Sequence, residues 1–105
     1  MEFFWVTACD AVDEGAYERR TAARKEHLNM LEQRKADGTV RFAAATLGED
    51  GRLNGSMLVV ACTNISEAER IVQQDPYVAH NVWREITIVP CRIAPMFNKK
   101  MFAAL

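Results

Sequence analysis

The alternation of hydrophobic and polar positions divides the chain into segments with the period of strands or of helices. Residues 3–9 are aromatic, β-branched or small and are too few for a helix, so they predict a first strand. Residues 39–46, 56–63 and 85–92 follow the same pattern, each with an apolar centre rich in valine, isoleucine or alanine. The sequence therefore predicts four strands.

Two segments between these strands have the composition of helices. Residues 13–36 are rich in glutamate, alanine, arginine, lysine and leucine, and Asp13 is placed to cap their start. Residues 66–74 open as a capping box, with Ser66 at the cap and a glutamate three residues later. Pro76 ends this second helix, because the residue before a proline is driven out of the helical region.

The order strand–helix–strand–strand–helix–strand predicts a ferredoxin-like α+β fold. Residues 47–55 hold three glycines and form the turn of a hairpin, and right-handed crossovers then place both helices on one face of a four-stranded antiparallel sheet. We expect residues 1–94 to form this single domain. Sheet-to-sheet packing with a second copy would cover the other face, which predicts a homodimer or a higher oligomer built from it.

Composition narrows the class of protein. The chain has 105 residues, half of them apolar, and a formal net charge of −1, which argues against nucleic acid or a membrane as the main partner. Cys9, Cys62 and Cys91 are widely spaced in apolar segments, so we expect free thiols in a reducing, cytoplasmic compartment. No metal-ligand spacing or glycine-rich phosphate loop occurs, and we expect no metal or other cofactor.

Residues 95–105 extend beyond the last predicted strand. Apolar residues at 95–97 and 101–102 surround an asparagine and two lysines. We expect this extension to dock on the partner subunit or on its own sheet edge; a flexible tail is the alternative.

The first helix carries charged residues where apolar ones are expected. One stripe, defined by spacings of three and four, holds Tyr17, Arg20, Arg24, His27, Leu28 and Leu31. The tyrosine and leucines suggest that this stripe faces the sheet, so the arginines and the histidine would need an anion there. That anion would be a protein carboxylate such as Asp75, or the carboxylate or enolate of a ligand. In the alternative interpretation the arginines lay their aliphatic stems on the sheet and extend their charged heads to water. We weigh this alternative equally with anion binding for Arg24 and favour it for Arg20.

Asp75 also has two interpretations. Aspartate before proline is a good helix start, with Asp75 as the N-cap and Pro76 as the first helical residue, and local chemistry favours this capping role. The carboxylate would be a site residue if it met His27 across the fold. The two roles are compatible, because one oxygen can cap while the second orients an imidazole. Tyr77 would then be a wall of the pocket.

Several short motifs in order resemble those of the YciI-like (YCII-domain) family over residues 2–92. The motif residues are Arg20, Arg24, His27, Leu28, Leu31, Gly38, Val40, Gly51, Gly55, Ser56, 66–68, 75–77 and 89–90. The resemblance implies a dimeric α+β barrel related to muconolactone isomerases and cofactor-free monooxygenases. It also implies a site centred on His27 and Asp75, and one branch of the family is a dehydrochlorinase. The chain departs from the family at residues 43–46, where a glycine–proline pair is usual.

These observations favour a cofactor-free lyase or isomerase that acts on a small, ring-derived, anionic or enolic substrate. His27 would be the general acid/base and Asp75 would orient it. Arg24 and Arg20 would hold the negative charge, and Tyr77 and Ser56 would line the pocket. The alternative is a non-catalytic small-molecule-binding or accessory protein that uses the same pocket. A haem- or flavin-assisted oxygenase ranks last.

Overall fold

The computed structural model describes residues 1–100 and, for residues 98–100, the backbone alone. Its elements are β1 (Glu2–Asp10), α1 (Ala16–Ala36), β2 (Val40–Leu47), β3 (Leu53–Cys62), α2 (Ile65–Gln73), α3 (Pro76–Ala79), β4 (Trp83–Cys91) and α4 (Pro95–Lys100). The strands form one antiparallel sheet in the order β2-β3-β1-β4. The predicted ferredoxin-like α+β fold is confirmed.

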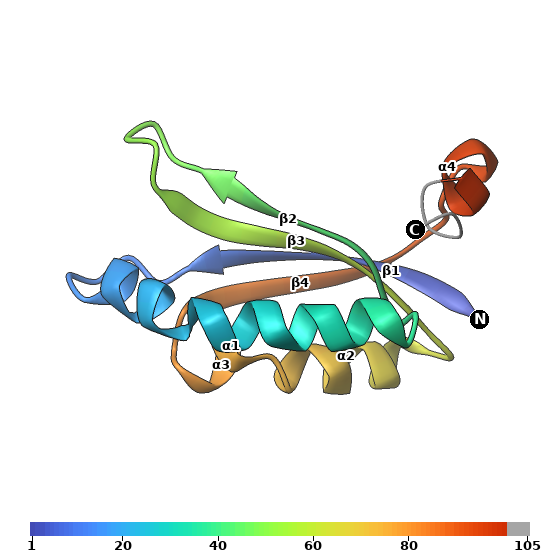
Figure 1. Ribbon diagram of the computed structural model, residues 1–105, viewed down its shortest axis with the longest axis horizontal. Coiled ribbons are helices and arrows are strands. Elements are labelled where there is room, and N and C mark those ends of the chain that lie inside the picture. The colour runs from blue at the N-terminus through green and yellow to red at the C-terminus, as the bar shows by residue number, and fades with distance from the viewer. Residues whose placement is uncertain (101–105) are drawn as a thin grey trace.

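The core lies between the sheet and the helices α1, α2 and α3, which all cover the same face (Figure 1). Along β1 the side chains alternate, so that Phe4, Val6 and Ala8 are buried toward the helices. Asp10 follows the same alternation, as the next even-numbered residue, and is buried at the end of the strand. The strand therefore delivers a carboxylate to the helix face of the sheet, beside the start of α1.

The caps predicted for the two long helices, α1 and α2, were wrong. α1 begins at Ala16 after Gly15, without a side-chain cap, because the Asp13 carboxylate is instead held by Arg19. α2 begins at Ile65, and its cap is Asn64, two residues before the predicted Ser66; the Asn64 side chain accepts a hydrogen bond from the Glu67 N–H. Asparagine and serine are both good caps, so the sequence offered two nearby choices.

The inward stripe of α1 was predicted correctly for Arg20, His27 and Leu31 and incorrectly for its other members. Its buried residues are Ala16, Arg20, Ala23 and His27. Tyr17 and Leu28 are 41% and 42% exposed, and Arg24 is exposed as well. The small alanines allow the helix to lie close to the sheet, and the arginine and histidine between them are buried against polar partners.

The hairpin between β2 and β3 is tighter than predicted, because β3 begins at Leu53 instead of Ser56. Gly55 is required there by close contact: a Cβ atom on this residue would lie 2.6 Å from the Thr46 hydroxyl and 2.7 Å from the Ala8 carbonyl oxygen. This close approach brings the neighbouring Ser56 under α1, where its side chain is buried.

The expected extension at 95–105 is described only as far as residue 100, and residues 101–105 lie outside the described part. In α4, Met96 and Phe97 are exposed, and this helix lies on the opposite side of the sheet from α1 and α2 (Figure 1). Its docking on a partner stays a prediction. No helix within residues 1–100 is both long and apolar enough to span a membrane.

Candidate functional site

His27 and Asp75 are in contact, although 48 positions separate them in the chain. The Nδ1 atom of His27, in the middle of α1, lies 2.8 Å from Oδ1 of Asp75, which precedes α3. Both side chains are more than nine-tenths buried. An ionised carboxylate only accepts hydrogen bonds, so Nδ1 must carry the hydrogen of this bond. The other ring nitrogen, Nε2, then has a free lone pair whenever the ring is neutral.

Asp75 caps a helix and contacts the histidine with the same oxygen. Its Oδ1 atom also accepts the Tyr77 backbone N–H at 2.9 Å, and Pro76 follows as the first residue of α3. The expectation that the second oxygen would orient the imidazole therefore does not hold. The backbone bond fixes the carboxylate, and the carboxylate in turn fixes the tautomer and the plane of the imidazole.

Two aromatic side chains enclose the imidazole. Tyr77 stacks on His27, with 3.9 Å between ring centroids and 9° between planes. Trp83 meets both rings edge-on, at 5.9 Å from His27 and 5.7 Å from Tyr77. Burial raises the pKa of the Tyr77 hydroxyl, while the charges of Arg20 and Arg24 pull it in the opposite direction. The Tyr77 hydroxyl is thus protonated near neutral pH.

Arg20 lies in the same cluster but binds a different carboxylate from the one proposed by sequence. Its Nη1 donates to both oxygens of Asp10, at 3.2 and 3.1 Å, and its Nη2 donates to the Gly55 carbonyl and the Ser56 hydroxyl at 3.2 and 3.4 Å. The guanidinium also lies 4.8 Å from the centre of the Tyr77 ring. Arg20 is only 3% exposed, so its head does not extend to water.

Asp10 is incompletely stabilised by this arginine. Burial raises the pKa of Asp10, although the charge and the hydrogen bonds of Arg20 act to lower it. The neighbouring Arg19–Asp13 pair differs, since two guanidinium nitrogens reach two carboxylate oxygens at 2.7 Å each. The Arg20–Asp10 contact is therefore longer and less complementary than a two-nitrogen fork.

The remaining predicted site residues fall in different places. Arg24 is exposed, which agrees with the alternative in which its head extends to water and not with an inward orientation, although its charge reaches the Tyr77 hydroxyl. Ser56 is buried beside Arg20 and accepts a hydrogen bond from the Trp83 indole. The sequence interpretation missed Asp10 and Trp83. Asp10 has the parity of the buried β1 residues, a signal that could have identified it.

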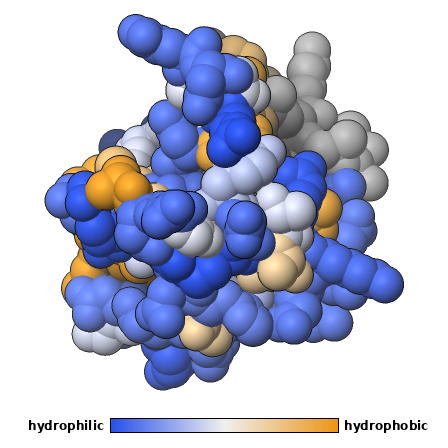
Figure 2. Space-filling view, turned by 90° about the vertical axis from the view of Figure 1, so that its left-hand side faces the viewer, coloured by the Kyte–Doolittle hydropathy of each residue, from blue (hydrophilic) through white to orange (hydrophobic). Residues whose placement is uncertain are grey.

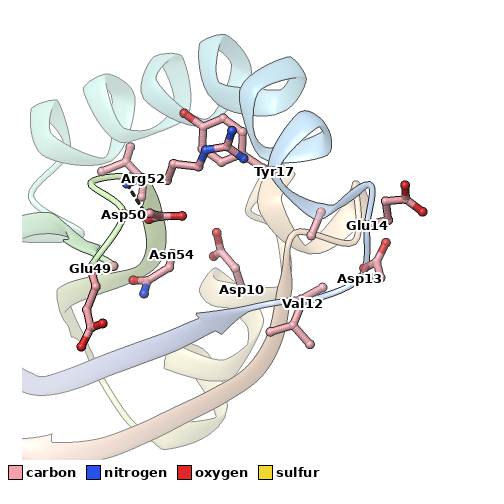
Figure 3. Close-up of a pocket in the computed structure, with 13 residues that line it drawn as sticks. Asp10, Val12, Asp13, Glu14, Tyr17, Glu49, Asp50, Arg52 and Asn54 are labelled. Carbon is pink, nitrogen blue, oxygen red and sulfur yellow. Dashed lines mark hydrogen bonds between the residues drawn. The ribbon is translucent and has the colours of Figure 1, made fainter.

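A cavity of about 520 Å³ opens beside Asp10, between the β1–α1 loop and the hairpin tip. The Asp10 carboxylate points into this space, and Tyr17, Arg52 and Asn54 lie around it (Figure 3). The end of the molecule that carries the start of α1 and the hairpin tip is mainly hydrophilic (Figure 2). His27 and Asp75 do not line the cavity, whereas Asp10 does. Arg20 connects the cavity to the buried cluster, because it donates to Asp10 and its guanidinium lies over the Tyr77 ring.

The fold and the buried cluster define a ferredoxin-like α+β protein with a histidine–aspartate pair between its helices. The model of the YCII-related domain matches residues 3–92, and the chain belongs to this family. A comparison with curated proteins gave no match.

Two solved structures share the fold. The chain is similar to 5-chloro-2-hydroxyhydroquinone dehydrochlorinase from Burkholderia phenoliruptrix AC1100, in complex with 2,5-dihydroxybenzoquinone, with 21% identity, a TM-score of 0.75 and coverage of 90% of this chain and 97% of the other. A dimeric ferredoxin-like protein of unknown function from Jannaschia sp. CCS1 has 11% identity, a TM-score of 0.50 and coverage of 89% and 100%. At these identities the similarity shows the fold.

Proposed function

We propose that this protein is a cofactor-free lyase or isomerase that moves a proton on a small, ring-derived, anionic or enolic substrate. The observation that carries the proposal is the 2.8 Å contact between Nδ1 of His27 and the buried carboxylate of Asp75. A histidine held in one tautomer by a carboxylate is a common general acid/base arrangement. Asp75 orients the ring and stabilises the imidazolium that forms.

The free Nε2 atom of His27 is the proposed base. This atom has no hydrogen-bond partner within residues 1–100. It is not fully buried, so it keeps access to solvent. In an elimination from a keto tautomer of the ring, it takes a proton from an O–H or C–H bond, the electron pair of that bond forms a π bond toward the carbon that carries the leaving group, and the bond to the leaving group breaks so that the group departs as an anion. In an isomerisation the imidazolium returns the proton to another atom.

Arg20 and Tyr77 are the proposed groups that stabilise negative charge on the substrate. Arg20 is fixed by Asp10 and by the start of β3, and the Tyr77 hydroxyl stays protonated because burial raises its pKa. Arg24, at the exposed margin, is assigned to the approach of an anion. The substrate class is suggested by the dehydrochlorinase of similar fold, which acts on a chlorinated hydroxyhydroquinone.

The second candidate is a non-catalytic binding or accessory protein. One observation favours it: the cavity beside Asp10 is large enough for a single-ring ligand, yet neither member of the His27–Asp75 pair lines it. In this hypothesis the pair is structural and the ligand stays near Asp10.

Substitutions at the pair separate these functions. Asparagine is a good N-cap, so Asp75→Asn keeps the start of α3 but removes the charge, whereas Asp75→Ala removes both. We expect 5-chloro-2-hydroxyhydroquinone to be converted by the wild type, and its conversion to fall at least about a hundredfold in His27→Ala and in Asp75→Asn. Ring ¹⁵N shifts should show Nδ1 protonated in the neutral wild type.

Two results would count against the dyad. If His27→Ala melts like the wild type and converts the substrate at an unchanged rate, His27 is not the base. If Asp75→Ala loses about 1 kcal/mol or more of stability while His27→Ala changes neither stability nor turnover, Asp75 is only a cap. Binding of 2,5-dihydroxybenzoquinone without turnover of the chlorinated compound would favour the binding protein.

We also propose a homodimer through the open face of the sheet. Strand pairing places Trp5, Phe42, Met57 and Val89 on this face, opposite the helices, and Phe42 and Val89 are more than 40% exposed. Val89→Lys should convert a sedimenting dimer to a monomer, whereas Val12→Lys, on the β1–α1 loop, should leave it unchanged. A monomeric wild type, or a dimeric Val89→Lys variant, would refute this interface.

The free thiols Cys9, Cys62 and Cys91 suit a reducing compartment, and we assign the protein to the cytoplasm on that basis. Recovery of the protein in a membrane or secreted fraction would contradict this assignment.

A further inference from the structure

The Ser56 hydroxyl has a hydrogen with no acceptor among the described residues. Its oxygen accepts one hydrogen bond from the Trp83 indole Nε1 at 3.1 Å and another from Arg20 Nη2 at 3.4 Å. Neither donor can accept a bond in return. A hydroxyl has two lone pairs and one hydrogen, so both lone pairs are occupied and the hydrogen is left to donate elsewhere. Ser56 is buried, which makes an unused donor costly.

Arg20 supplies a second unused donor at the same place. Its Nε atom is fully buried and has no partner, the only such side-chain atom in the described part of the chain. In a guanidinium the Nε–H is parallel to one N–H of Nη2. The two partners of Nη2 are the Gly55 carbonyl and the Ser56 hydroxyl, and Nε is bonded to the same guanidinium carbon as Nη2. Both unused donors therefore lie at the start of β3.

We propose that the Ser56 hydroxyl and the Arg20 Nε–H form a two-donor subsite for one oxygen atom of a ring ligand, with Trp83 as the positioning residue that orients the hydroxyl. Two donors without an acceptor select a carbonyl, enolate or phenolate oxygen and reject an amine. The faces of the Tyr77 ring are covered by the His27 imidazole and the Arg20 guanidinium, so this ring supports the Arg20 donor and does not stack on the ligand. The inference deepens the proposed function, because it assigns the substrate oxygen that would be held while His27 acts.

The cavity next to this cluster limits the charge of the ligand. It is bounded by Asp10, which binds Arg20, and its lining includes four more carboxylates, from Asp13, Glu14, Glu49 and Asp50. Arg52 is the one basic residue among the described residues that line it. A multiply charged anion is repelled by this rim. The ligand class is therefore a neutral or singly charged oxygenated ring.

Titration with tropolone, a singly ionisable ring with adjacent oxygens, tests the subsite in the full-length protein. Arginine Nε–H and tryptophan Nε1–H groups are both visible in ¹⁵N–¹H spectra. We expect saturable shifts of the Arg20 Nε and Trp83 Nε1 signals, with the signal of Trp5, on the other sheet face, as an unmoved reference. Inorganic phosphate should not move them.

The variants should follow a defined order of affinity. Ser56→Ala should weaken tropolone binding about ten- to hundredfold, the usual loss of a hydrogen bond to a charged group. Trp83→Phe keeps an aromatic ring but frees the hydroxyl to rotate, so it should lose less affinity than Ser56→Ala. Ser66→Ala, on the surface of α2, should bind like the wild type. A role of Trp83 in packing alone predicts no difference once the fold is intact.

The proposal is overturned if tropolone does not bind the wild type, if it binds Ser56→Ala with unchanged affinity, or if phosphate causes the same shifts, which would indicate an adventitious ion only. His27→Ala distinguishes this failure from failure of the proposed function. Loss of turnover in His27→Ala with normal tropolone binding by Ser56→Ala refutes the subsite and keeps the function. Undiminished turnover in His27→Ala with weak tropolone binding by Ser56→Ala refutes the function and keeps the subsite.

Discussion

Separation of the buried Arg20–Asp10 pair should destabilise the fold strongly. The two side chains are 4% and 9% exposed, so removing either one leaves the other charge buried without its partner. Loss of one member of a buried pair costs about 3–5 kcal/mol, from a total stability of about 5–15 kcal/mol for a domain. Arg20→Met should lie at the upper end, because the Gly55 carbonyl and the Ser56 hydroxyl lose their donor as well.

The double variant Arg20→Met/Asp10→Leu should be more stable than the additive prediction. It buries neither charge, and exchange of a buried ion pair for apolar side chains is often neutral or stabilising. We therefore expect a coupling free energy of at least about 2 kcal/mol between the two positions. Urea unfolding at pH 7 measures it, with the protomer concentration held constant because association shifts apparent stability.

The adjacent Arg19–Asp13 pair is the matched control. It has the shorter, two-nitrogen geometry at 2.7 Å but is exposed, so its geometry is better and its burial much lower. Arg19→Met should change the free energy of unfolding far less than Arg20→Met. If the two single variants of the buried pair cost no more than the control, or if their effects simply add, the argument from desolvation is wrong.

Three further outcomes are expected. Gly55→Ala should cost about 1–3 kcal/mol in urea unfolding, because its Cβ would meet backbone and side-chain oxygens at 2.6–2.7 Å. Asn64→Ala should lose about 1 kcal/mol, while Ser66→Ala should lose almost none; equal losses would contradict the assigned cap. A hydrogen bond from Arg19 lowers the pKa of Asp13 from 3.8 to about 2, so its stabilisation is present above 3.8 and is lost as the pH falls through about 2. The difference in Tm between the wild type and Asp13→Asn should shrink over that range, and a constant difference would refute this assignment.

The period of apolar residues was sufficient to predict the order of strands and helices, because each element follows its own local chemistry. The Asp75–Pro76 start of α3 is likewise a local signal. The inward face of α1 was not predictable in the same way. Its small buried residues, Ala16 and Ala23, carry little hydrophobic signal, whereas the exposed Tyr17 and Leu28 carry a strong one. A helix that packs closely through alanines therefore gives a misleading pattern.

The partners of the buried charges depend on contacts that no local pattern encodes. Asp10 is close to Arg20 in sequence, but their pairing requires β1 to end beneath α1, and Ser56 joins them only because Gly55 lets the three neighbouring strands approach. Trp83 was missed for the same reason, since its indole is oriented by a serine on another strand. Parity along β1 remains the one local signal that would have identified Asp10.

Two carboxylates, and not one, neutralise the charged stripe of α1. From sequence, Asp75 was the predicted partner of the histidine and one candidate anion for the arginines, beside the carboxylate or enolate of a ligand. In the structure Asp75 contacts His27, and Asp10 contacts Arg20. The two pairs therefore differ, since Asp75 fixes the tautomer of an imidazole while Asp10 holds an arginine whose Nε has no partner among the described residues. The proposed proton transfer at His27 and the proposed oxygen binding at Arg20 can then be tested by separate substitutions, which is why the two proposals can fail independently.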